Sequence, residues 1–220
     1  MVETIQYAFK MNMNSIKWMD AETKVAALAK FSKLRFNIGY PDFYDDSDLT
    51  LFSSHMNYTV NRRDFYANVE NSMQLKVKLS LQRLFTSRNP DEWLTSPRST
   101  DAHYKEQTNE VVFPAGILQK PLYDFENPIA VNYGAFGSIL GHEIMHAFDR
   151  HGAMYDLNGL DNFWWSNHTL RKFNQESDCV VNSYLKYINE TGQVFSHHSC
   201  IESLISDCSV KRAKKQQCAP

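Results

Sequence analysis

Two histidines and a glutamate in one short segment have the types and spacing of a hydrolytic metal site. His142, Glu143 and His146 form the pattern His-Glu-x-x-His. On a helix, a four-residue spacing places both imidazoles on one face, where they can converge on one tetrahedral zinc ion. Glu143 then lies beside the metal-bound water. This arrangement suits an open, hydrolytic site and not a structural site closed by four protein ligands.

A carboxylate near the second histidine is predicted to support it. Asp149 follows His146 by three residues on the same helix face, where it can accept a hydrogen bond from the imidazole and orient the ligand. Both interpretations have an alternative. The two histidines can be a hydrogen-bonded pair without a metal, and Asp149 can be a solvated aspartate in the last turn of the helix.

The elements that must position these residues are predicted to be mainly helical. Apolar residues at helical spacing, or an alanine-rich stretch with an acidic start and a basic end, predict helices over 2–16, 23–35, 65–84 and 132–148. The third segment also alternates like a strand, but its length and its lysines favour a helix. Glycines at 134, 137 and 141 weaken the last helix and therefore predict close packing against another backbone or a ligand.

The remaining segments predict a loop and a strand. Residues 37–50 carry turn formers and four aspartates, so we expect an exposed loop. After Pro97 the chain is expected to be extended through 110–113 and to stop at Pro114, which favours an edge strand because proline cannot donate a ladder hydrogen bond. The predicted fold class is α+β and mainly α-helical, with the metal-binding helix packed against a short edge-strand sheet.

Composition excludes several classes of function. The chain has 220 residues, 43% hydrophobic and 22% charged, as in folded globular proteins, and its net charge of −2 gives no overall attraction to nucleic acid. It contains no apolar stretch of the length of a transmembrane helix and no signal peptide. Sequons at Asn57, Asn167 and Asn189 have meaning only on an exported protein, the alternative being chance. A missing N-terminus would reconcile these two observations.

Several spaced segments share the pattern of one known family. The segments are 18–24, 38–41, 109–119, 131–149 and the pair Trp164-Trp165. Together they resemble the neprilysin and endothelin-converting-enzyme family of zinc metallopeptidases. The resemblance implies a gluzincin-like catalytic half-domain over residues 1–194. Residues 195–220 are polar and cysteine-rich and predict a divergent, disordered tail. Because the closing segments of the family fold are absent, we expect the apolar face at Trp164-Trp165 to be exposed.

The resemblance also implies roles for individual residues. His142 and His146 become ligands of one Zn²⁺ ion, and Glu143 becomes the general base that activates water for attack on a peptide carbonyl. Asp101 and Ala102 match the Asn-Ala pair of the family's substrate-binding strand. Aspartate at this position keeps an acceptor oxygen but loses the amide donor. The alternative for this segment is an ordinary edge strand.

The third zinc ligand of the family has no clear match in this chain. The family takes it from a later Glu-Asn-x-x-Asp motif, which does not follow residue 194. Glu202 is the candidate replacement, against the alternative of a solvated tail residue. In the family, the cysteine that matches Cys179 forms a disulfide with one near the C-terminal end, so Cys179 is expected to be unpaired here.

Two functional hypotheses follow from these observations. In the first, the chain is part of an ectodomain that is secreted or held at the extracellular face of the plasma membrane and cleaves small peptides with zinc. In the second, it is a catalytically inactive truncated isoform or fragment that binds zinc weakly or acts as an interaction module. The resemblance implies peptide substrates, and it allows a homodimer of the full-length parent protein.

Overall fold

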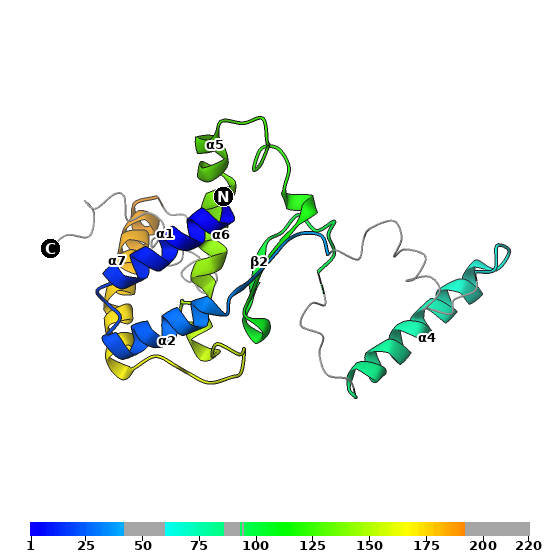
Figure 1. Cartoon of the computed structure of the whole chain (residues 1–220), viewed down its shortest axis with the longest axis horizontal. Helices are drawn as coiled ribbons and strands as arrows, with labels where there is room; N and C mark the ends of the chain where they lie inside the picture. The colour runs from blue at the N-terminus through cyan, green and yellow to red at the C-terminus, as the bar shows by residue number, and fades with distance from the viewer. Residues whose placement is uncertain (42–59, 86–92, 94, 192–220) are drawn as a thin grey trace. The chain divides into compact units, whose positions relative to one another are not determined.

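The computed structural model describes residues 1–41, 60–85, 93 and 95–191. The chain divides into two compact units, Met1–Gly39 with Pro97–Pro220 and Tyr40–Ser96. The first unit contains α1 (Val2–Ser15), α2 (Ala21–Ser32), β1 (Arg35–Gly39), β2 (His103–Lys105), η2 (Glu106–Thr108), β3 (Glu110–Pro114), η3 (Ala115–Ile117), α5 (Ile129–Gly134), α6 (Phe136–His146), η4 (Gly152–Met154) and α7 (Asn167–Thr191). Its helices α1, α2, α6 and α7 lie together on one side of a small sheet (Figure 1). The mainly helical α+β class is therefore confirmed.

The sheet has three strands in the order β1-β3-β2. β1 runs parallel to β3, with Arg35 opposite Glu110, and β2 runs antiparallel to β3. The prediction of an edge strand at 110–113 was wrong, because β3 is central and all five of its residues are buried. Pro114 is the last residue of the strand, so its missing N–H falls at the end of the ladder. The prediction of a loop from residue 37 was also wrong, since 37–39 belong to β1, and 42–50 lie outside the described residues.

The extended segment expected after Pro97 is a short hairpin. β2 and β3 are joined by η2 and by Asn109, which has a left-handed backbone with φ of 50°. Asparagine tolerates this conformation better than most residues. Its side chain is also held in place, because the Asn109 amide donates to the Lys30 carbonyl and its oxygen accepts from the Tyr104 hydroxyl.

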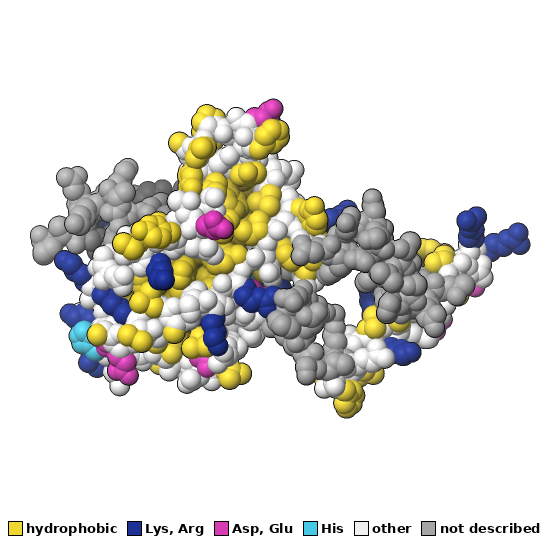
Figure 2. Space-filling view, viewed as in Figure 1, with side chains coloured by type: hydrophobic (Ala, Val, Ile, Leu, Met, Phe, Trp, Pro, Cys, Tyr) yellow, Lys and Arg dark blue, Asp and Glu magenta, His cyan; other side chains and the backbone are white. Residues whose placement is uncertain are grey.

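The single helix predicted over 132–148 is divided in two. Ala135, with φ of −89° and ψ of −80°, separates α5 from α6, and α6 ends at His146. The close packing predicted at the glycines against a backbone or a ligand is not found at Gly134 or Gly137: at Gly134 an added Cβ would meet nothing within 4 Å, and at Gly137 it would come within 3.3 Å of Ile5 Cδ1 of α1. The neighbour is thus a side chain and not a backbone. Figure 2 shows hydrophobic side chains at the surface around α5. Phe125 and Ile129, just before and at the start of α5, are both exposed.

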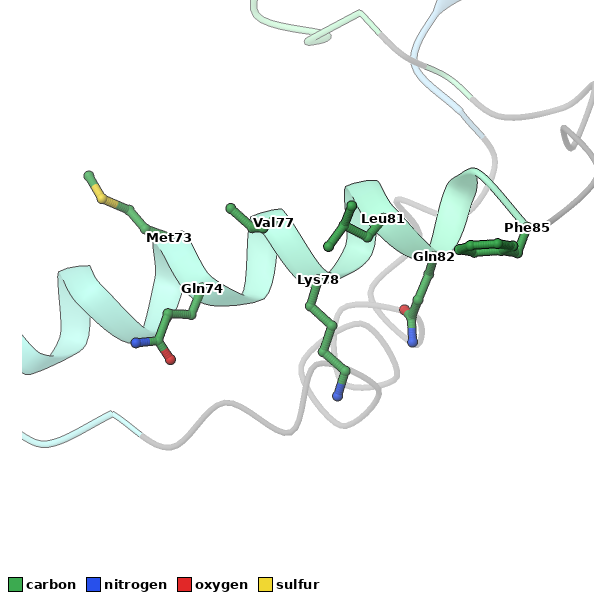
Figure 3. A pocket seen from close by; sticks show the side chains of 7 residues that line it. All are labelled: Met73, Gln74, Val77, Lys78, Leu81, Gln82 and Phe85. Carbon is green, nitrogen blue, oxygen red and sulfur yellow. The ribbon is translucent and has the colours of Figure 1, made fainter.

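The second unit contains α4 (Phe65–Arg83), as the helical interpretation of this segment predicts. Asp64 begins the helix by accepting a hydrogen bond from the Ala67 backbone N–H at 2.9 Å. Met73, Val77 and Leu81 follow one another along α4 and are exposed (Figure 3). None of the helices in the described ranges combines the length and the apolar character that crossing a membrane requires.

The core of the first unit surrounds α6. Leu140 and Ile144 are fully buried against side chains of α1, α2 and the sheet. A second cluster contains Ala153, Trp165 and Phe173, and the ring centroids of the last two lie 4.8 Å apart. Trp165 is only 5% exposed, so the expectation of an exposed tryptophan face was wrong. The start of α7 and the loop before it supply the packing that was expected to be missing.

A polar network joins the N-terminal ends of α2 and α7. Asp20 begins α2 by accepting from the Thr23 backbone N–H at 2.9 Å, and it also accepts from the Ser166 hydroxyl. Ser166 in turn accepts from the Thr169 backbone N–H at 3.0 Å, and the Thr169 and Thr23 hydroxyls are 3.0 Å apart. Asp20, which caps α2, and Ser166, which caps α7, therefore also bind each other.

We expect Asp20→Ala to lower the free energy of unfolding by about 1–2 kcal/mol at pH 7, because α2 loses its cap and its link to α7. Hydrogen bonds from Ser166 and Thr23 lower the pKa of Asp20 from 3.8 to about 2. The stabilisation is therefore present above pH 3.8 and lost as the pH falls through about 2. Urea unfolding of both proteins at pH 7 and at several acidic pH values measures the difference.

The matched control is Glu22→Ala, which removes an exposed carboxylate from the first turn of the same helix. It is expected to cost only a few tenths of a kcal/mol through the helix dipole. Equal losses in the two variants would contradict a special role for Asp20.

Candidate metal centre

Helix α6 presents two different faces. Leu140 and Ile144 point into the core. The face that carries His142 and His146 is therefore directed toward the surface. Both histidines are half-buried, whereas Glu143, between them in sequence, is only 7% exposed. The helix thus holds all three side chains of the motif at one place.

The two imidazoles face each other. The Nε2 atoms of His142 and His146 are 3.0 Å apart, and the two ring planes are inclined by 85°. Ligand atoms of these two residues and of Glu143 all lie within 4.8 Å of one another. Two nitrogens bound to one tetrahedral zinc ion lie about 3.4 Å apart, which is close to the 3.0 Å between these two Nε2 atoms. The residues present therefore fit zinc.

Asp149 binds the Nδ1 atom of His146, on the other side of the ring from Nε2. His146 Nδ1 lies 2.8 Å from Asp149 Oδ2, and the Gly152 backbone N–H donates to Asp149 Oδ1 at 2.7 Å. With its Nδ1 proton directed at the carboxylate, His146 keeps the Nε2 lone pair for a metal. Gly152 lies so close to the end of α6 that an added Cβ would be 2.1 Å from the His146 carbonyl oxygen. Only glycine fits at this position.

Burial and hydrogen bonds set the charges of the site. Burial raises the pKa of Glu143, and the charges of His146 and His142 and a hydrogen bond from the Tyr104 backbone offset this rise only in part. Burial lowers the pKa of His146, but the hydrogen bond and the charge of Asp149 outweigh it and leave the pKa above 6.5. A carboxyl group with a raised pKa is suited to exchange protons near neutral pH.

The predicted substrate-binding pair lies directly before the edge strand β2. Asp101 is exposed, and its backbone N–H donates to the Ser99 hydroxyl at 3.3 Å. Ala102 is buried in the core cluster. β2, which follows this pair directly, contacts α6, and the negative charge of Asp101 favours the protonated form of Glu143.

Two contributions to the site were not predicted from the sequence. Tyr104 binds Glu143 through its backbone, which no residue type can reveal. Lys30 reaches from α2 to the loop after α6, although a lysine near the end of a helix is typical of an exposed residue. Glu202 and the predicted tail 195–220 lie outside the described residues, as does the side chain of Cys179 in α7.

Comparisons with known proteins identify relatives along most of the chain. Family models described as peptidase family M13 match residues 1–41 and 101–211. An endothelin-converting enzyme homolog of Locusta migratoria is 35% identical over 213 residues, which are 97% of this chain and 29% of that protein. Neprilysin-3 of Drosophila melanogaster is 37% identical over 191 residues, 85% of this chain and 24% of that protein. The chain therefore spans less than a third of the length of these relatives.

Solved structures give a consistent result. The zinc metalloprotease ZMP1 of Mycobacterium tuberculosis in complex with an inhibitor superimposes with a TM-score of 0.75 at 28% identity, over 100% of this chain and 34% of that one. The open state of the same protein gives a TM-score of 0.69 at 33% identity, over 83% and 27% of the two chains.

In the metal-free protein we expect His146 to titrate above 6.5 and Asp149→Asn to lower this pKa, because the carboxylate that favours the imidazolium loses its charge. A raised pKa contributes stability that is present below about pH 6.5 and lost as the pH rises through the folded-state value. An NMR titration of the histidine ring protons measures both proteins.

Asp156→Asn serves as the control for this titration. Asp156 belongs to the same loop but accepts from the backbone N–H groups of Asn158 and Leu160. It should leave the titration of His146 unchanged. A wild-type pKa at or below 6.5 would show that burial outweighs Asp149.

Proposed function

The chain belongs to peptidase family M13 and covers part of that family's catalytic domain, and on this basis we propose that it carries the active site of a zinc-dependent metalloendopeptidase of the neprilysin type. The substrates are small peptides, whose peptide bonds are hydrolysed. The observation that carries this proposal is the pair of Nε2 atoms of His142 and His146, which face each other at 3.0 Å beside the buried Glu143.

His142 and His146 would hold the zinc ion through Nε2. When bound, zinc lowers the pKa of a water molecule and polarises the substrate carbonyl. Glu143 accepts the proton of the attacking water and returns it to the leaving amine as the C–N bond breaks. Burial favours this proton uptake, and the Tyr104 backbone holds the carboxylate in place. Asp149 orients His146.

Asp101 and Ala102 are proposed to contact the peptide substrate. They precede β2, which is an edge strand of the sheet and lies next to α6. An extended peptide can align along such an edge through main-chain hydrogen bonds. The Asp101 carboxylate would accept from a substrate N–H group, because an ionised carboxylate has no donor of its own.

The second candidate function is a catalytically inactive fragment that binds zinc weakly or acts as an interaction module. It is favoured by the composition of the metal group, which within the described ranges consists of His142, Glu143 and His146. With Glu143 assigned to proton transfer, two histidines remain, and a catalytic zinc ion usually takes three protein ligands. Glu202 is the proposed third ligand in the first function and has no role in the second.

We place the parent protein at the extracellular face of the plasma membrane or among secreted proteins. Asn167 and Asn189 of two glycosylation sequons are exposed, which supports this assignment. A homodimer of the parent protein stays a prediction.

The test combines zinc binding with hydrolysis of a quenched peptide by the purified chain. Wild type is expected to bind one zinc ion per chain. His146→Ala should weaken binding at least 100-fold, because half of the described ligand pair is lost. Glu143→Gln should keep the metal and lose about 10²–10⁴-fold in turnover. The control is His168→Ala, which removes an exposed histidine of α7 and should change neither quantity.

Glu202→Ala separates the two candidate functions. Loss of both zinc and turnover in this variant would support a complete peptidase site in this chain. Weak zinc binding that depends on His146, without turnover in the wild type, would support the inactive fragment. Zinc binding that His146→Ala leaves intact would contradict both candidates.

A further inference from the structure

Lys30 is a buried cation that has no part in the proposed mechanism. It is 1% exposed, and its Nζ donates to the carbonyl oxygens of Gly152 and Tyr155, both at 2.7 Å. The rings of Tyr104 and Trp164 lie 5.8 and 5.5 Å from the same nitrogen. Removing an ammonium group from water is costly unless it finds hydrogen-bond acceptors. Burial of Lys30 therefore requires that these two carbonyl groups stay in position.

The Gly152 carbonyl receives a second donor. Trp164 Nε1 lies 3.3 Å from the same oxygen, so a lysine from α2 and a tryptophan from the loop before α7 both hold it. The backbone N–H of Gly152 donates to Asp149, and Asp149 binds His146. A continuous series of hydrogen bonds thus runs from Lys30 and Trp164 through one glycine to the predicted zinc ligand.

This series matters because Asp149 lies beyond the end of α6. The helix ends at His146, so its backbone ladder does not fix the Asp149 carboxylate. The turn that does fix it closes with the hydrogen bond from Gly152, and Gly152 is wedged against the His146 carbonyl. A shift of Gly152 would therefore be transmitted to Asp149 and to the ring orientation of His146.

We propose that Lys30 and Trp164 are positioning residues of the metal centre, which hold the Gly152 carbonyl so that Asp149 orients His146 for zinc. In this proposal neither residue contacts the metal or the substrate. The inference rests on the proposed function, since it requires His146 to bind zinc. It adds residues from α2 and from the loop before α7 to a site whose predicted ligands within the described residues, His142 and His146, both come from α6.

The experiment measures the zinc dissociation constant of the full chain by competition with a chelator, at a temperature where circular dichroism shows each variant folded. Lys30→Met is expected to weaken zinc binding about 3–10-fold, and Asp149→Asn about 10–100-fold. In the double variant the dissociation constant should match that of Asp149→Asn within about twofold, because Lys30 acts through the carboxylate that is no longer charged.

Lys33→Met is the matched control. Lys33 is exposed, and its Nζ contacts Asn158 in the same loop at 3.1 Å, yet it does not reach Gly152. Its zinc affinity should equal that of the wild type within about twofold. Thermal unfolding of each metal-free variant separates a loss of stability from a loss of zinc affinity in the folded state.

Two results would overturn the inference. The first is a Lys30→Met protein with wild-type zinc affinity. The second is a double variant in which the two effects multiply, since that result assigns Lys30 a general structural role. If Lys30→Met does not fold, Trp164→Phe replaces it, since this variant keeps an aromatic ring and removes the other donor to the Gly152 carbonyl. Unchanged zinc affinity in Trp164→Phe would then overturn the inference. Wild-type zinc binding that does not depend on His146 would instead overturn the proposed function, and this inference with it.

Discussion

The structure of the first unit depends on the requirement that α6 be buried on one side and polar on the other. Leu140 and Ile144 anchor the helix in the core, so the histidine face lies close to apolar surroundings. Polar groups held there must find partners, because an unpaired buried carboxylate is costly. Tyr104 supplies one partner to Glu143, and Gly152 supplies one to Asp149. The hairpin and the loop after α6 therefore supply the hydrogen bonds that the buried carboxylates beside this helix require.

The sequence predicted those parts of the site that depend on near neighbours. The spacing of His142 and His146 determines that these side chains meet, because a helix brings residues four apart together. Asp149 reaches His146 from the turn that follows the end of α6. The order of the strands could not be predicted, since β1 pairs with β3 across a long intervening segment. Pro114 was misleading for a related reason. The same residue marks an edge strand or the end of a central one, and only the pairing partner decides between them.

Lys30 and Lys33 show how little residue type reveals about burial. Both are lysines near the end of α2, where a positive charge favours the helix dipole. One is completely buried and bound to two carbonyl groups, whereas the other is exposed and contacts Asn158. The difference arises from the loop 147–160, whose Gly152 and Tyr155 carbonyls bind Lys30, whereas Lys33 contacts the Asn158 side chain of the same loop at the surface. No local pattern in the α2 sequence could identify which lysine the loop buries.

Contacts around the candidate metal centre form over very different distances along the chain. His146 and Asp149 are 3 residues apart, whereas Lys30 reaches Gly152 over 122 residues and Ser166 reaches Asp20 over 146. Closing long loops costs conformational entropy and slows folding. During synthesis, the zinc-binding helix can form within one local event, but its surroundings must wait until the region around Ser166 has left the ribosome. Formation of the zinc-binding helix and completion of its surroundings would thus be separate steps of folding.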